Sequence, residues 1–262
     1  MRRYFYLNLW RTLLFFIICG YAQPVFSQDN FLGEKYAYKL TYLSIPAVNI
    51  FISVPETLLI RGQKVFHVLA VARTNSLFSP FYTLENHYDT YIHTDSGLPV
   101  QFNKDIHQRT LTQQGEISYD QEKLQAVYDG GKFVSQITTS IQKNTHNLFS
   151  MIFYLRREAL HIGQQFNFNL DVESEPWNVE TKVIARENIK AADSLYEAYK
   201  ISFQFIPTKE ELKRHHTDIL TRRVATSKTR LYFWIGVAPP YPFLKVEYEM
   251  SPFSAYTTMV KD

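Results

Sequence analysis

Hydrophobic and polar residues alternate along most of the chain, which predicts β-strands. Within residues 165–172 one face would carry Phe166, Phe168, Leu170 and Val172, and the other Gln165, Asn167, Asn169 and Asp171. Side chains of a strand point alternately to opposite faces, so only a period of two sorts these residues in this way. The same pattern predicts strands at 36–41, 48–54, 65–72, 84–93, 116–119, 124–128, 133–137, 179–185, 196–205, 229–235, 243–248 and 256–260.

Short turns separate several of these strands. Asp129-Gly130-Gly131 and Asp95-Ser96-Gly97 have the composition of tight hairpin turns. Arg61-Gly62 and Pro239-Pro240 mark further breaks. Strands joined by such short turns are expected to be antiparallel neighbours.

One segment, residues 147–160, has helical spacing instead. Its apolar positions are Leu148, Ile152, Leu155 and Ala159, and Gly163 follows where a helix could end. We expect this helix to support the sheet from inside, with its apolar stripe buried. Arg156 would then face water or pair with a carboxylate near the mouth of the fold.

A second segment, residues 208–220, begins with Thr208 and Glu211 at the spacing of a capping box. Its many charges predict a helical segment at the surface. The fold class is therefore mainly β: a single antiparallel β-barrel or β-roll with one internal helix and one surface helical segment. We expect residues 28–262 to form this single domain.

Residues 1–27 have the features of a signal peptide. The apolar stretch 13–18 follows three basic residues, Arg2, Arg3 and Arg11, and is too short to span a membrane. Cleavage is expected after Ala22 or after Ser27, with the second site preferred. We therefore expect an exported protein of the periplasm or cell envelope.

Cys19 raises the question of a lipid anchor, since bacterial lipoproteins are modified on a cysteine at the cleavage site. The preceding residue is Ile18, where that signal requires a small residue, so we do not expect an anchor at Cys19. Cleavage would leave no cysteine in residues 28–262. Disulfides, thiol catalysis and cysteine-based metal sites are then excluded.

The leader contains three of the 28 basic residues and none of the 25 acidic ones. The exported domain would therefore be close to neutral, which gives no electrostatic reason to expect nucleic acid as a partner. The sequence contains no G-x-S-x-G, H-E-x-x-H, G-x-G-x-x-G or P-loop motif, and no cofactor is expected.

Aromatic residues are abundant, at 16% of the chain. Aromatic side chains in a strand-rich protein first serve core packing. If the fold leaves room among them, Tyr38, Phe51, Phe203 and Phe233 are the candidates to line a site for a lipid or another apolar ligand.

A second candidate site lies on the strand 84–93. Glu85, His87, Asp89 and His93 recur every second residue, so they share one face and could converge on a metal ion such as zinc. The competing interpretation is the solvated outer face that antiparallel sheets normally have.

Several segments together resemble an exported bacterial family called domain of unknown function 3108. They are 31–35 followed by Tyr38 and Tyr42, 72–74 with Phe78 and Tyr82, 98–99 before Phe102, and 147–156 followed by Gly163. The resemblance implies one mainly antiparallel β domain of the envelope and transfers no catalytic residue. Two departures from the family are Ala47-Val48, where a glycine is common, and Asn147, where many members have Asp.

These observations lead to two hypotheses. The first is a non-catalytic exported protein of the cell envelope. It would either bind a ligand, such as a lipid or another apolar molecule, or assemble with an envelope protein. The alternative is a metal-dependent envelope hydrolase that uses Glu85, His87, Asp89 and His93.

Overall fold

The computed structural model describes residues 31–131, 133, 135–208, 218–227, 230–250 and 253–261. The predicted signal peptide and both of its cleavage sites lie outside these ranges. The elements in chain order are β1 (Lys35–Tyr42), β2 (Ile45–Ile60), β3 (Gln63–Thr74), β4 (Leu84–His93), β5 (Pro99–Gln108), β6 (Leu111–Asp120), β7 (Gln125–Gly130), β8 (Ile137–Ser140), β9 (Thr145–His146), α2 (Leu148–Arg157), β10 (Gln165–Val172), β11 (Glu175–Ala191), β12 (Ser194–Pro207), α3 (Ile219–Val224), β13 (Arg230–Gly236), β14 (Phe243–Met250) and β15 (Phe253–Val260).

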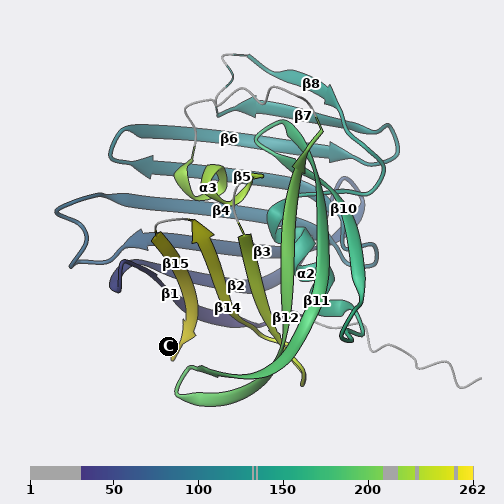
Figure 1. Ribbon diagram of the computed structural model, residues 1–262. Helices are drawn as coiled ribbons and strands as arrows, with labels where there is room; N and C mark the ends of the chain where they lie inside the picture. Colours follow the sequence, from purple (N-terminus) through teal and green to yellow (C-terminus); the bar gives the residue numbers. More distant parts are fainter. Residues whose placement is uncertain are drawn as a thin grey trace, which may run out of the picture. The chain divides into compact units, whose positions relative to one another are not determined.

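All 15 strands belong to one sheet (Figure 1). From edge to edge the order is β8-β7-β6-β5-β4-β3-β2-β1-β15-β14-β13-β12-β11-β10-β9. Neighbouring strands are antiparallel except β9 and β10, which are parallel. The predicted mainly antiparallel β fold is confirmed, and the first strand pairs with the last in the middle of the sheet.

The two edges of the sheet lie close together because the chain passes directly from one to the other. Only residues 141–144 separate β8 from β9. A chain of this length spans at most about 18 Å, so the sheet curls until its edges approach each other. No backbone pairing joins β8 to β9, and the sheet is therefore not closed. We call the gap between the β8 edge and the β9–β10 edge the seam.

Two of the longest strands bend where their register shifts. The shift in β2 lies between Ser53 and Glu56, and the shift in β11 lies between Val183 and Ala185. Such irregularities bend a strand and increase its twist. In Figure 1 the long strands β11 and β12 consequently pass across the front of β3–β8.

Helix α2 lies inside this curl, as predicted, and packs against β4, β9 and β10. Asn147 caps it: the Ser150 backbone N–H donates to Asn147 Oδ1 at 2.8 Å, and the Asn147 N–H donates to Ser150 Oγ at 3.0 Å. Met151 and Leu155 are almost completely buried in the main core. The helix ends at Arg157 rather than at residue 160.

Arg156 pairs with a carboxylate, which is one of the two arrangements that the sequence predicts for it. Its guanidinium donates to Glu34 Oε1 at 2.8 Å and to the backbone oxygens of Pro240 and Tyr241. It also lies 4.7 Å from the ring centroid of Phe31. The pair is buried, so it fixes α2 to the residue before β1 and to the β13–β14 turn.

The second predicted helix differs from the observed one. Residues 209–217 lie outside the described ranges, and α3 covers Ile219–Val224. Its N-cap, Asp218, is fully buried and accepts hydrogen bonds from Asn86 (3.0 Å), Tyr88 (2.6 Å) and Gln108 (2.5 Å). The start of α3 is therefore held against β4 and β5, rather than being a purely surface segment.

The strand predictions missed β5 altogether, and placed a strand at 133–137 although β8 begins only at Ile137. They also missed hairpin turns without glycine. Leu43-Ser44, Glu173-Ser174 and Ala192-Asp193 each supply two residues with positive φ, between 44° and 66°. This is the backbone of a two-residue turn that glycine or asparagine normally occupies.

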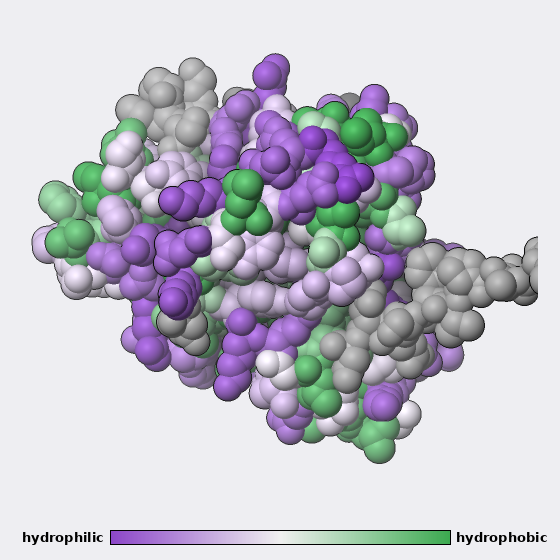
Figure 2. Space-filling model, turned by 90° about the horizontal axis from the view of Figure 1, so that it is seen from below, coloured by the Kyte–Doolittle hydropathy of each residue, from purple (hydrophilic) through white to green (hydrophobic). Residues whose placement is uncertain are grey.

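The face seen from below carries hydrophilic residues throughout, with hydrophobic residues in small separate groups (Figure 2). Among the described residues no helix is long and apolar enough to cross a membrane.

Candidate functional site

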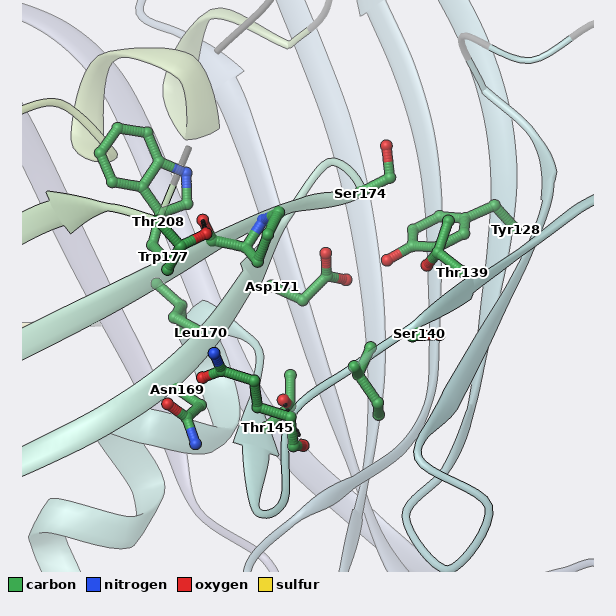
Figure 3. Close-up of a pocket in the computed structure, with 13 residues that line it drawn as sticks. Tyr128, Thr139, Ser140, Thr145, Asn169, Leu170, Asp171, Ser174, Trp177 and Thr208 are labelled. Carbon is green, nitrogen blue, oxygen red and sulfur yellow. Dashed lines mark hydrogen bonds between the residues drawn. The ribbon is translucent and has the colours of Figure 1, made fainter. Parts of the chain in front are cut away.

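A pocket of about 470 Å³ lies at the seam (Figure 3). Its walls come from β7 and β8 on one side and from β9, β10 and the start of β11 on the other. Small-molecule sites occupy roughly 300–1,000 Å³ in proteins, so the volume is sufficient for a ligand. The pocket exists because the curled sheet stops short of closure.

The described lining is chemically mixed. Hydroxyl groups come from Tyr128, Thr139, Ser140, Thr145, Ser174 and Thr208. Two amides, Gln142 and Asn169, and one carboxylate, Asp171, add further hydrogen-bonding groups. Ile141, Leu170, Pro176 and Trp177 add apolar groups, and apolar atoms make up the larger part of the accessible lining.

Asp171 is the centre of the polar wall. It is 6% exposed, and Tyr119 donates a hydrogen bond from its hydroxyl to Asp171 Oδ2 at 2.8 Å. Burial raises the pKa of Tyr119 and of Tyr128 well above the ordinary value, and the adjacent negative charge of Asp171 raises both pKa values further. The two tyrosines therefore remain protonated near neutral pH and act as donors.

A buried ion pair supports the same region. Lys104 on β5 donates from Nζ to Glu173 Oε2, in the turn between β10 and β11. The side chains are only 4% and 9% exposed. Because each charge is neutralised by the other, the pair positions the β10–β11 turn beside the pocket and adds little net charge to it.

Trp177 contributes an unusual group to the wall. The residue is 6% exposed, and its indole Nε1 has no hydrogen-bond partner among the described residues. A buried donor without a partner costs free energy, so most such groups in proteins are satisfied by protein, water or ligand. The unpartnered N–H therefore belongs to a residue of the pocket wall, where a bound acceptor would satisfy it.

The predicted apolar site divides between two faces of the sheet. Tyr38, Phe203 and Phe233 are buried in the main core. Phe203 and Phe233 pack edge to face with their centroids 4.3 Å apart, and the Tyr38 hydroxyl donates to the Phe243 backbone oxygen at 2.9 Å. Phe51 is 46% exposed and does not join them. The structure therefore brings three of the four residues together, and they pack against one another.

The predicted metal-binding residues all point outward from β4. Glu85 pairs with Arg73, His87 lies 3.4 Å from Glu85, and Asp89 binds His67 at 2.6 Å. His93 accepts from the backbone N–H of Ser96. In the part of the chain that the structure describes, no three His, Cys, Asp or Glu side chains are grouped to hold a metal ion. The arrangement is that of the solvated outer face.

Comparison with known families identifies the chain. The model of the family described as "Protein of unknown function (DUF3108)" matches residues 37–260. This protein belongs to the DUF3108 family. The predicted resemblance is confirmed over most of the sequence, and no curated protein matches significantly.

One of three similar solved structures shares the fold of this DUF3108 protein. A β-barrel-like protein of domain of unknown function DUF1849 from Brucella abortus superposes with a TM-score of 0.54 at 12% identity, over 88% of this chain and 97% of that chain. A candidate lipoprotein from Parabacteroides distasonis gives 0.38 at 8% identity, over 87% and 94% of the two chains. A candidate exported protein with a YmcC-like fold from Bacteroides fragilis gives 0.36 at 8%, over 88% and 96%.

The structure also accounts for the family departure at position 147. Asn147 serves as the N-cap of α2, and its side chain binds the Ser150 backbone. Asp and Asn are about equally good N-caps, so either residue fills this role. The exchange therefore needs no catalytic explanation.

The pocket residues of this DUF3108 protein were not identified from the sequence. Asp171 was assigned to the exposed polar face of the strand 165–172, yet it is buried. The alternation itself was correct, but the polar face of β10 turns into the pocket near its end.

Proposed function

We propose that this DUF3108 protein is exported to the bacterial cell envelope, where it binds a small molecule in the seam pocket without transforming it. The leader of residues 1–27 supports export. The observation that carries the binding role is the buried Nε1 of Trp177, which has no partner among the described residues and lies in the pocket wall. A bound molecule would supply the missing acceptor.

The non-catalytic part of the proposal rests on the lining. Asp171, the only ionisable carboxylate among the described lining residues, is occupied by tyrosine hydroxyls. A side-chain nucleophile activated by a neighbouring base, as in hydrolases that form a covalent intermediate, is not found among these residues. The groups present bind and orient a ligand.

The aromatic interior remains part of the proposal in a different role. We assign Tyr38, Phe203 and Phe233 to the hydrophobic core, where their side chains are buried. We place the ligand at the seam instead. An apolar ligand would then have to enter the seam pocket. Lipids therefore belong among the probes, and a partner envelope protein remains the competing role.

Native mass spectrometry of protein purified from an exporting bacterial host tests the proposal. We expect an N-terminus at Gln28 or Gln23, and a small molecule bound in a one-to-one complex. Ser140→Trp fills the pocket and should abolish the complex, whereas Ser194→Trp, at the exposed first residue of β12, should preserve it. An uncleaved leader would contradict export, and protein free of any ligand would contradict the binding role.

A further inference from the structure

We propose that the seam pocket binds a neutral, hydroxyl-rich ring molecule, namely one or two sugar units. This inference rests on the proposed binding function and assigns its ligand class. It follows from the kinds of hydrogen-bonding groups in the wall, from the charge of the described lining, and from the unpartnered donor of the lining residue Trp177.

The wall offers both hydrogen-bond donors and hydrogen-bond acceptors. A sugar hydroxyl donates one hydrogen bond and accepts two, so it needs both kinds of partner. Asp171 supplies acceptor oxygens, Gln142 supplies an amide with both functions, and Ser140 and Ser174 supply hydroxyls. Trp177 supplies a fixed donor. A fatty acyl chain would leave these groups without partners, at a cost for each one.

The polar wall is also ordered in advance. Tyr128 interacts with Asp171 and with Thr139 through side-chain hydrogen bonds. Tyr119 holds Asp171 from behind the pocket at 2.8 Å. Figure 3 shows the Asp171 carboxylate directed toward Tyr128 and Thr139. An acceptor fixed in this way loses little conformational freedom when a ligand hydroxyl binds to it.

Charge argues against anionic ligands. No Lys, Arg or His belongs to the described lining, and the nearby Lys104 is paired with Glu173. A phosphate or a free carboxylate would therefore meet the Asp171 side chain without a compensating cation among the described lining residues. Neutral hydroxyl groups carry no such penalty.

Trp177 determines how the ring system would be recognised. Its indole packs edge to face against Phe205, with centroids 6.3 Å apart, and the residue is almost fully buried. The ring face is therefore not open for stacking, and the unpartnered Nε1 is itself buried, so a ligand oxygen reaches it only when the side chains that cover it move. We infer that Trp177 donates to a ligand oxygen instead of stacking on a sugar ring.

Isothermal titration calorimetry on the exported chain tests this inference. The saccharide probes are glucose, galactose, N-acetylglucosamine and the disaccharides of each, and the comparison probes are laurate, inorganic phosphate and spermidine. We expect at least one saccharide to bind with one-to-one stoichiometry and the comparison probes to give no heat of binding.

Paired tryptophan variants locate the site. Trp177→Phe keeps an aromatic side chain but replaces the indole by a phenyl ring without the unpartnered donor, so saccharide affinity should fall about tenfold, the equivalent of one hydrogen bond. Trp234→Phe makes the same chemical change where Nε1 donates to Glu187 Oε1 at 2.5 Å, outside the pocket lining, and should leave the affinity unchanged.

Each outcome decides a separate point. Saccharide binding that Trp177→Phe does not weaken would overturn the proposed site. Binding of laurate or spermidine alone, weakened by Trp177→Phe, would overturn the ligand class while keeping the seam pocket as a binding site. No binding by any probe, together with ligand-free protein in native mass spectrometry, would overturn both proposals.

Discussion

The hydroxyl of Tyr119 on β6 donates to the carboxylate of Asp171 on β10 at 2.8 Å, and both residues are buried. These strands lie near opposite edges of the sheet order, so the bond spans the interior beside the seam. The ion pair of Lys104 and Glu173 makes a second connection between the same two parts of the sheet. Side chains thus hold together edges that the backbone does not join.

Replacing Tyr119 by Phe should destabilise the protein. The change removes a donor and leaves a buried carboxylate oxygen short of a partner, which costs roughly 1–3 kcal/mol. Urea unfolding followed by circular dichroism measures the loss. Tyr256→Phe, at a residue 40% exposed, is the matched control and should have little effect. Equal stability of the two variants would show that the Tyr119 bond does not hold the curl.

The buried pair of Arg156 and Glu34 should matter much more than an exposed one. Arg156→Met leaves the Glu34 carboxylate buried without its cation, a change that typically costs about 3–5 kcal/mol. Arg186 pairs with Glu197 at the surface, where both side chains are more than two-fifths exposed, so Arg186→Met should change the stability little. Chemical denaturation of both variants compares them, and similar losses would refute the distinction.

Leu155 should be essential to the internal helix. It is 1% exposed, and Leu155→Ala would leave a cavity in the main core at a cost of roughly 2–5 kcal/mol. Leu195, 71% exposed in the β11–β12 hairpin, provides the control, and Leu195→Ala should melt with the parent. Differential scanning calorimetry gives both melting temperatures. A Leu155→Ala protein that also melts with the parent would place α2 outside the core.

His146 should make the protein less stable in acid. Burial lowers its pKa from 6.5 to about 4, so the unfolded chain binds a proton between these values while the folded protein does not. Stability is therefore complete above about pH 6.5 and falls as the pH drops toward 4, by roughly 3 kcal/mol.

Other groups titrate in the same range, so the comparison is between two pH profiles of the unfolding free energy. In His146→Phe the fall between pH 7 and pH 4 should be smaller by about that amount, because the replacement cannot take up a proton. Parallel profiles for the two proteins would show that His146 titrates normally in the fold.

Local patterns predicted those elements whose two faces differ in polarity. The alternation in β10 and the helical spacing of α2 were recognised because each element buries one side and exposes the other. β5 was missed because its sequence, PVQFNKDIHQ, buries Lys104 and Gln108 on its inner face, so polar residues interrupt the pattern. The Glu173-Ser174 turn was missed because neither residue is a usual turn former at positive φ.

The sequence by itself determined the antiparallel β class, the internal helix and the membership of the family, because these depend on the spacing of side chains along one stretch of chain. Only the tertiary structure decided that the sheet curls without closing and that Asp171, Tyr128 and Trp177 meet at the seam. These residues come from strands near opposite edges of the sheet. Their proximity depends on the accumulated twist and bending of all the strands between them, which no local pattern encodes.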